Sequence, residues 1–162
     1  MSIDGTVTLA VNANDRRTVG INTGANLPAN FTPSQSFTNG SGAGQANVLY
    51  QGQLSLSAGT YNVDLNGILT DSYGTLVSLL RVKAIIFQNN SASNPMTLGA
   101  GTNPWITFLN STGTITLPAG AAIAAFTPDA TGWGVLAATG DILKVVGTGT
   151  DQFTIIVLGA SS

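Results

Sequence analysis

The sequence predicts an all-β fold, a β-sandwich or barrel, on two observations. Short segments in which apolar and polar residues alternate recur every ~8–12 residues, with Gly-rich turns between them. No long amphipathic helical segment interrupts this rhythm. The 162 residues fit one domain, which is large enough to bury a core without disulfides or metals.

The N-terminal region is predicted to be a strand followed by an extended arm. Thr6 to Val11 alternates apolar and polar side chains, as a strand does. The polar segment after it ends in the adjacent cations Arg16 and Arg17. Gly20 to Asn47 is rich in Gly, Asn, Ser and Thr and shows no sustained periodicity. This region is therefore expected to be disordered or to form an arm that folds against a partner.

The strand pattern becomes regular after Val48. Alternation in Leu54–Leu56 and in Tyr61–Leu65, with a turn at 57–60 between them, predicts a β-hairpin. The sequence of residues 71–74, Asp-Ser-Tyr-Gly, has the Asp first and the Gly fourth, which is the preference of a type I turn.

Leu79 to Ser91 is the most clearly patterned strand. Its two cations alternate with apolar residues, so Arg81 and Lys83 are predicted to share one face. The opposite face is predicted to carry Val82, Ala84 and Ile86. The apolar run from Ile85 to Phe87 is expected in the core. A longer helix beginning at Leu76 is the alternative, but the β-branched residues favour a strand.

The C-terminal half continues with short apolar segments separated by Gly- and Pro-containing turns. The predicted strands are Met96–Leu98, Trp105–Leu109, Thr114–Leu117, Ala122–Thr127, Trp133–Ala138, Ile142–Val146 and Phe153–Leu158.

Charged residues make up 7% of the chain, against about 25% in an average soluble protein. A weakly charged surface tends to associate, which suits a protein that works in an assembly. The net charge of −2 and the five scattered cations argue against nucleic acid as a partner. No apolar run approaches the ~20 residues that span a bilayer, and the N-terminus carries no secretory signal, so no membrane is expected.

The residue types of most catalytic and metal sites are missing, because the chain has no His, Cys or Glu. His-dependent triads and ordinary zinc sites are therefore excluded, and no cofactor or small-molecule substrate is expected. Carboxylate pairs remain an alternative, but four carboxylates lie in turn sequences where Asp caps its own backbone: Asp71, Asp129, Asp141 and Asp151. Trp105 and Trp133 are predicted to fill the core rather than to stack on a sugar.

Six residues are candidates for contact with a protein partner. Loops and arms carry function more often than cores, which favours the cation pair of the arm and the arm's two aromatic residues. The two cations of the clearest strand could meet an acidic partner, with cross-strand pairing or solvent exposure as the alternative. The candidates are Arg16, Arg17, Phe31, Phe37, Arg81 and Lys83.

Seven segments carry a resemblance to a known group of proteins: Gln53–Gly59, Asp64–Gly74, Arg81–Asn90, Leu117–Gly120, Pro128–Gly132, Asp141–Val145 and Phe153–Ser161. Their order resembles that of bacteriophage capsid decoration (cement) proteins and related small virion components. The resemblance covers about two-thirds of the chain and rests on turn and strand patterning. It implies a jelly-roll-like antiparallel β-sandwich, commonly trimeric, on the outside of the phage head. Gly20–Asn47 has no counterpart in it.

These observations together predict a non-enzymatic virion structural protein, made in the host bacterial cytoplasm. Residues 1–47 are expected to form a strand and arm, and residues 48–162 the sandwich, within one structural domain. The expected partners are the major capsid protein and other copies of the chain, as a homotrimer. The alternative is a receptor- or glycan-binding module of a phage tail fibre, using Trp105, Trp133 or Tyr73 as a stacking platform. An enzyme with two Asp carboxylates is the third possibility.

Overall fold

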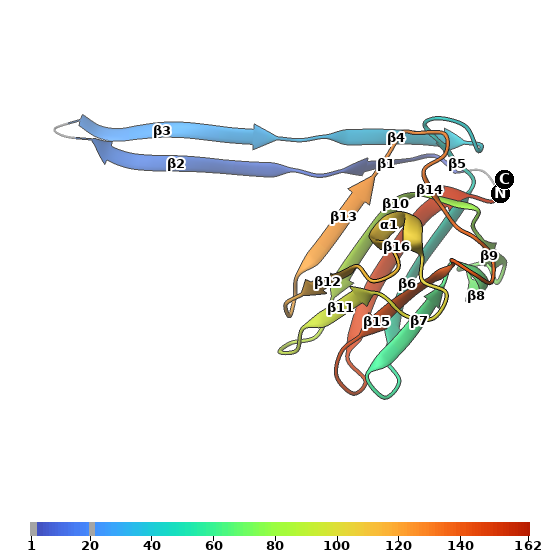
Figure 1. Cartoon of the computed structure of the whole chain (residues 1–162). Helices are drawn as coiled ribbons and strands as arrows, with labels where there is room; N and C mark the ends of the chain where they lie inside the picture. Colours follow the sequence, from blue (N-terminus) through green and yellow to red (C-terminus); the bar gives the residue numbers. More distant parts are fainter. Residues whose placement is uncertain (1–2, 20–21) are drawn as a thin grey trace.

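Two antiparallel sheets form the body of this computed structural model, which describes residues 3–19 and 22–162, with side chains for 3–15 and 27–162 (Figure 1). One sheet has the order β13 (Ala122–Phe126), β10 (Arg81–Asn89), β16 (Gln152–Ala160) and β6 (Val48–Ser55), with β14 (Trp133–Gly134) also paired to β10. The other has the order β12 (Thr114–Leu117), β11 (Met96–Gly99), β15 (Ile142–Val146) and β7 (Thr60–Asp64). The predicted all-β sandwich is confirmed.

The remaining strands lie at the margins of the sandwich. A two-stranded sheet pairs β8 (Asn66–Thr70) with β9 (Leu76–Ser78). Another small sheet, of three strands, consists of β1 (Gly5–Thr8), β4 (Ser34–Asn39) and β5 (Gln45–Ala46). From it projects a hairpin of β2 (Val11–Val19) and β3 (Asn22–Phe31), as Figure 1 shows.

The main core lies between the two large sheets. Phe87 from β10 and Phe153 from β16 are fully buried there, and their rings stack with centroids 5.0 Å apart. Tyr61 from the opposite sheet meets Phe153 edge to face at 5.7 Å. Burial of each such side chain stabilises the fold by about 1.5–3 kcal/mol, so these rings hold the two sheets together.

The turn of the predicted hairpin over Leu54–Leu65 is confirmed, but the predicted pairing of its two strands is wrong. Ser57 and Thr60 exchange backbone hydrogen bonds of 2.9 and 3.1 Å around Ala58 and Gly59, which both have positive φ. Beyond this turn β6 enters one large sheet and β7 the other. Each strand has one apolar face, and the two faces meet across the core instead of sharing a sheet.

β10 is central in its sheet, but the predicted assignment of its faces is wrong. Its register with β16 shifts between Val82 and Ala84, so Lys83 is an extra residue in a β-bulge. Val82 therefore joins the inner core, whereas Ala84 packs on the outer side of the sheet. Gly159 lies opposite the bulge, where a Cβ would collide with the carbonyl oxygen of Arg81. The predicted burial of Ile85 and Phe87 is confirmed.

Other predicted elements differ mainly in extent. Trp105–Leu109 is not a strand, because Ile106–Leu109 forms the one-turn helix α1, which lets Phe108 stack on Trp105. The strand predicted from Trp133 ends at Gly134. The strand predicted over Leu79–Ser91 is β10, Arg81–Asn89, and Leu76–Ser78 forms the separate strand β9 instead of the start of a helix. The type I turn at 71–74 is confirmed, with Gly74 N donating to Asp71 O at 3.0 Å. The strands β11, β12, β13, β15 and β16 confirm the remaining C-terminal predictions. Among the described residues, no helix is long and apolar enough to cross a membrane.

Candidate interaction surface

The region predicted to be an unpatterned arm forms most of a long, regular β-ribbon. Pairing runs without a shift from Gly5 opposite Phe37 to Arg17 opposite Ala25, across both β1–β4 and β2–β3. At about 3.3 Å per residue this ribbon is roughly 40 Å long. Beyond Thr8 and Ser34 it runs away from the body (Figure 1), and every side chain of 8–15 and 27–32 is exposed.

The projecting part of the ribbon is amphipathic. Directly opposed residues lie on the same face, so Val11 and Phe31 share one face, together with Ala13, Ala29 and the opposed pair Asp15 and Leu27. The other face pairs Asn12 with Asn30 and Asn14 with Pro28. Val11, Leu27 and Phe31 are 56%, 69% and 68% exposed. A two-stranded ribbon is marginally stable by itself in water, so this apolar face is suited to contact with a partner.

The base of the ribbon shows what its apolar face can pack against. Phe37 and Val7 lie on the same face as Phe31, because the register is unbroken. They pack on Ala84 and Leu158 of the five-stranded sheet, in a small second core with Ile3, Ala46 and Phe126. Phe37 is fully buried there. The apolar face of the ribbon is therefore buried at the base and exposed to solvent along the projecting part.

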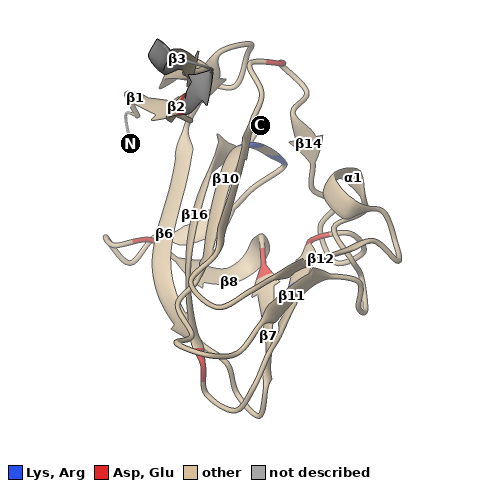
Figure 2. Cartoon of the chain, turned by 90° about the vertical axis from the view of Figure 1, so that its left-hand side faces the viewer, with Lys and Arg blue, Asp and Glu red and all other residues tan. Residues whose placement is uncertain are grey.

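The outer face of the five-stranded sheet is apolar beyond the area that the ribbon base covers. Ile86 and Ile156 are half-buried there, and Leu49 is exposed. A groove of about 490 Å³ lies between this sheet and β1, with Leu49, Ala84, Ile86, Ile156 and Leu158 on one side and residues 3–8 on the other. No charged residue lies in β6, β13 or β16, and the ribbons of β6 and β16 are tan in Figure 2. Since the outer face of an antiparallel sheet is commonly polar, this face is a second candidate contact surface.

Lys83 and Arg81 belong to the interior and margin of the chain's own fold. Lys83 is fully buried, and its ammonium donates to the carbonyl oxygens of Asp129, Ala130 and Gly42. It thereby ties the loop after β13 to the loop after β4. Burial lowers the pKa of Lys83, and the nearby Arg81 charge lowers it further. Arg81 is half-buried, and its Nη1 donates to Ala130 O at 3.0 Å.

The six predicted contact residues do not gather on one surface. Arg16 and Arg17 lie on β2 near the far end of the ribbon, opposite Asn26 and Ala25, and their side chains are outside the described residues. Phe31 lies where the ribbon leaves the body, and it is exposed as expected. The other three residues are buried or half-buried within the chain: Phe37, Arg81 and Lys83.

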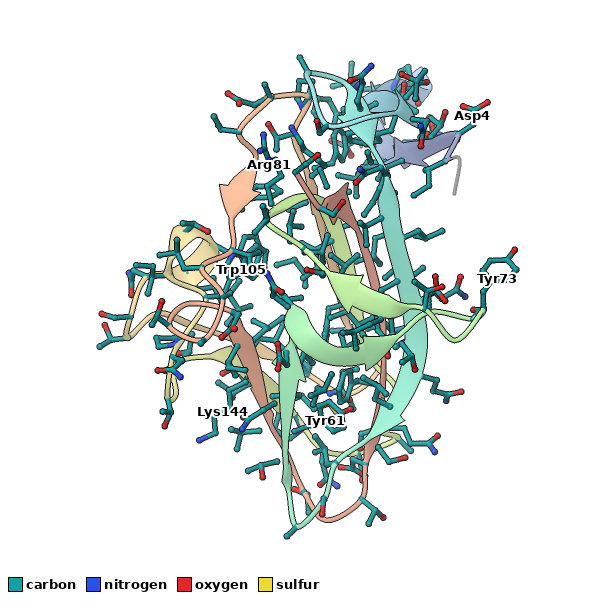
Figure 3. All side chains as sticks on the ribbon, turned by 90° about the vertical axis from the view of Figure 1, so that its right-hand side faces the viewer. Asp4, Tyr61, Tyr73, Arg81, Trp105 and Lys144 are labelled. Carbon is teal, nitrogen blue, oxygen red and sulfur yellow. The ribbon has the colours of Figure 1, made fainter. Side chains whose placement is uncertain are left out.

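Tyr73 is the most exposed of the three aromatic residues considered for glycan binding. Its side chain is 88% exposed and points away from the body at the tip of its turn (Figure 3). A hollow of about 300 Å³ beside it is lined by Ile3, Asp4, Leu49, Gln51, Asp71, Ser72 and Tyr73. Trp105 is buried as predicted, with Nε1 donating to Gly134 O at 2.9 Å, and Trp133 is half-buried against Phe108.

The turn roles predicted for the carboxylates hold for three of the four. Asp71 accepts from the backbone of Tyr73 and Thr75, and Asp141 from that of Ala138. Asp129 accepts from both the backbone and the hydroxyl of Thr131, whose hydroxyl is the main cause of its lowered pKa. Asp151 differs, because its carboxylate accepts from the side-chain amide of Asn94.

Sequence reasoning missed the apolar residues that define the two surfaces. On the ribbon, residues 26–31 read Asn-Leu-Pro-Ala-Asn-Phe, an alternation that predicts a strand with one apolar face. Pro28 made this segment look like a loop, although Pro is tolerated in edge strands such as these. On the sheet, the bulge at Lys83 reverses the faces of β10 beyond it. The outward position of Ile86 could therefore not be predicted from simple alternation.

Within the part of the chain that the structure describes, no three side chains of metal-ligating type are grouped so that they could hold an ion. The features with a distinctive chemistry are therefore the two apolar surfaces and the hollow beside Tyr73. Comparison of the chain with protein-family models, with curated proteins and with solved structures gives no match.

Proposed function

We propose that this chain is a non-enzymatic structural protein of a phage virion, which decorates and cements the capsid exterior. It contacts subunits of the major capsid protein and assembles as a homotrimer. The observation that carries the proposal is the projecting ribbon, whose apolar face has Val11, Leu27 and Phe31 exposed. Exposure of such an apolar face to water is unfavourable, and it is typical of a surface that a partner covers.

The strand order supports a jelly-roll topology for the body. In four pairs of consecutive strands, one strand lies in each of the two large sheets. These pairs are β6 and β7, β10 and β11, β12 and β13, and β15 and β16. The resulting orders, β13-β10-β16-β6 facing β12-β11-β15-β7, support the proposal of an eight-stranded jelly roll. Viral capsid proteins and lectins both use this architecture, so it agrees with the resemblance to phage virion proteins.

The composition of the two surfaces also supports a role in assembly. The groove floor is uncharged, and Asp15 is the one charged side chain on the described part of the ribbon's apolar face, so contact requires the desolvation of few ions. The Asn-rich opposite face can stay hydrated or can bond to a further partner. An arm of this kind lets a small body reach a neighbouring subunit.

Removal of the projecting ribbon is expected to abolish attachment to phage heads without unfolding the body. Leu9 N donates to Pro33 O at 3.0 Å, so an Asn-Gly turn in place of residues 10–32 can join them as a two-residue hairpin. This cut keeps Phe37 and Ala46, which are buried and which a deletion of all of residues 20–47 would remove. Co-sedimentation with purified heads measures attachment, and circular dichroism measures folding.

A matched control changes the polar face of the same ribbon. Asn12→Ser and Asn30→Ser together leave the apolar face intact and are expected to retain attachment. Full attachment of the shortened chain, or absence of the wild-type chain from purified particles, would contradict the proposal.

The exposed Tyr73 favours a second candidate function, a glycan-binding module of a tail fibre. An exposed ring beside carboxylate and amide groups has the chemistry of a sugar-binding site. Tyr73→Ala is then expected to abolish glycan-array binding with an unchanged melting temperature. Ile68→Ala, which changes another exposed apolar side chain (67%), is the control and should leave binding unaltered. No wild-type binding to any glycan on the array would exclude this candidate.

A further inference from the structure

We infer that the groove on the outer face of the five-stranded sheet receives the projecting ribbon of a second copy of this chain. The inference rests on the proposed role of the ribbon as an assembly arm, and it names the partner of that arm. Each copy then gives one ribbon and receives another. Such contacts close either as a reciprocal dimer or as a ring, of which the proposed homotrimer is one.

The chain already contains a smaller contact of the same kind. At the ribbon base, Val7 and Phe37 pack on Ala84 and Leu158. Farther out, the same face of the ribbon presents Val11, Phe31 and Leu27. The groove continues the same sheet face with Ile86, Ile156 and Leu49. A second copy can therefore extend an existing apolar interface with side chains of the same kind.

A ribbon cannot fill the groove of its own chain. The wall of the groove is formed by residues 3–8, which include β1, so the groove lies beside the base of the ribbon. The projecting part of that ribbon continues away from the body (Figure 1). The occupant must come from another molecule.

One edge of β1 can receive an incoming strand. β1 pairs with β4 on one side, and no strand lies along its other edge among the described residues. Backbone groups of this edge border the groove, where an incoming strand can add to the sheet while its alternate side chains reach the apolar floor. Either strand of the projecting hairpin is extended and suited to such pairing.

The area also agrees with a specific contact. A two-stranded face about 30 Å long and about 10 Å wide covers roughly 300 Å². If each copy of a reciprocal pair buries one ribbon face and one groove, the total is roughly 1,200 Å², at the lower limit of stable specific interfaces. The groove side contributed by the sheet is uncharged, and Asp4 lies on the other side, so the sheet side suits the apolar residues Val11, Leu27 and Phe31 of the ribbon.

Disulfide trapping between two single-cysteine proteins tests this inference, because the natural chain has no Cys. Ala29→Cys places a thiol on the apolar face of the ribbon, and Ile156→Cys places one in the groove. After the two proteins are mixed and oxidised, we expect a mixed disulfide between them, identified by mass spectrometry of the linked peptides. Leu49→Cys is a second groove variant in case Ile156→Cys does not fold.

Asn30→Cys is the matched ribbon control, because residue 30 is adjacent to Ala29 but lies on the opposite face. It is expected to cross-link at least about tenfold less, since disulfides require Cα atoms within about 7 Å and suitably directed Cβ atoms. Equal trapping from both ribbon positions, or no trapping with either groove variant, would overturn the inference. If trapping fails but the shortened chain still loses attachment to heads, the proposed function stands and the ribbon binds the capsid protein. If trapping succeeds but the chain is absent from particles, the proposed function fails and the inference stands.

Discussion

Lys83→Ala is expected to lower the free energy of unfolding by about 3 kcal/mol, because it removes a buried ammonium that donates to three carbonyl oxygens. A hydrogen bond to a charged group contributes about 1.5–3 kcal/mol, and the carbonyls of Asp129 and Ala130 can recover part of this by binding water. The loop after β13 and the loop after β4 should therefore loosen together. Urea unfolding followed by tryptophan fluorescence measures the loss of stability.

Arg81→Ala is the matched control for Lys83→Ala. Arg81 is a cation of the same strand, but it is only half-buried and donates one hydrogen bond, to Ala130 O. Because this bond is exposed to solvent, water can replace it, and the removal of Arg81 should cost less than about 1 kcal/mol. Equal losses for the two variants would show that Lys83 does not hold the two loops together.

Phe37→Ala is expected to remove about 3–5 kcal/mol from the packing of the ribbon base, the usual cost of truncating a buried Phe. The side chain lies between the ribbon and the outer sheet face, in the core that it shares with Ala84 and Leu158. The main core around Phe87 lies on the other side of the sheet and should persist. Hydrogen exchange is therefore expected to speed up mainly in β1 and β4, more than in β10 and β16.

Phe31→Ala provides the control for Phe37→Ala on the same face of the same ribbon. Since Phe31 is 68% exposed, its truncation should leave the exchange rates of β1 and β4 unchanged while it weakens association. The division of the ribbon into an anchored base and a projecting part would be contradicted by faster exchange in β1 and β4 after Phe31→Ala. Unchanged exchange rates in these strands after Phe37→Ala would contradict it as well.

Much of the fold could be predicted from the sequence, because alternation and turn chemistry are local signals. β12 and β15 appear with the predicted bounds, and the turn at 71–74 forms as its Asp and Gly indicate. Pairing between strands could not be predicted in the same way. The turn at Ala58-Gly59 has hairpin geometry, yet whether its strands share a sheet depends on where the whole core lies. The bulge at Lys83 likewise depends on β16, about 75 residues away along the chain.

The candidate surfaces were less predictable than the fold. An arm was expected in the right region, and Phe31 is exposed on it, but the regular pairing of that arm was not foreseen. Phe37 was expected at a contact because loops and arms carry function more often than cores, and Lys83 because a cation on a strand face could meet an acidic partner. Both are instead buried by parts of the chain that are distant in sequence, such as Leu158 and Asp129.

The mass of the protein in solution tests the central claim, that the projecting ribbon joins one subunit to the next. Sedimentation equilibrium of the wild-type chain should give a multiple of the single-chain mass, with three chains expected for the proposed homotrimer. The chain with an Asn-Gly turn in place of residues 10–32 should give the mass of one chain and keep its β-type circular dichroism spectrum. A wild-type protein that stays a single chain at every attainable concentration, or a shortened chain that keeps the wild-type mass, would contradict the claim.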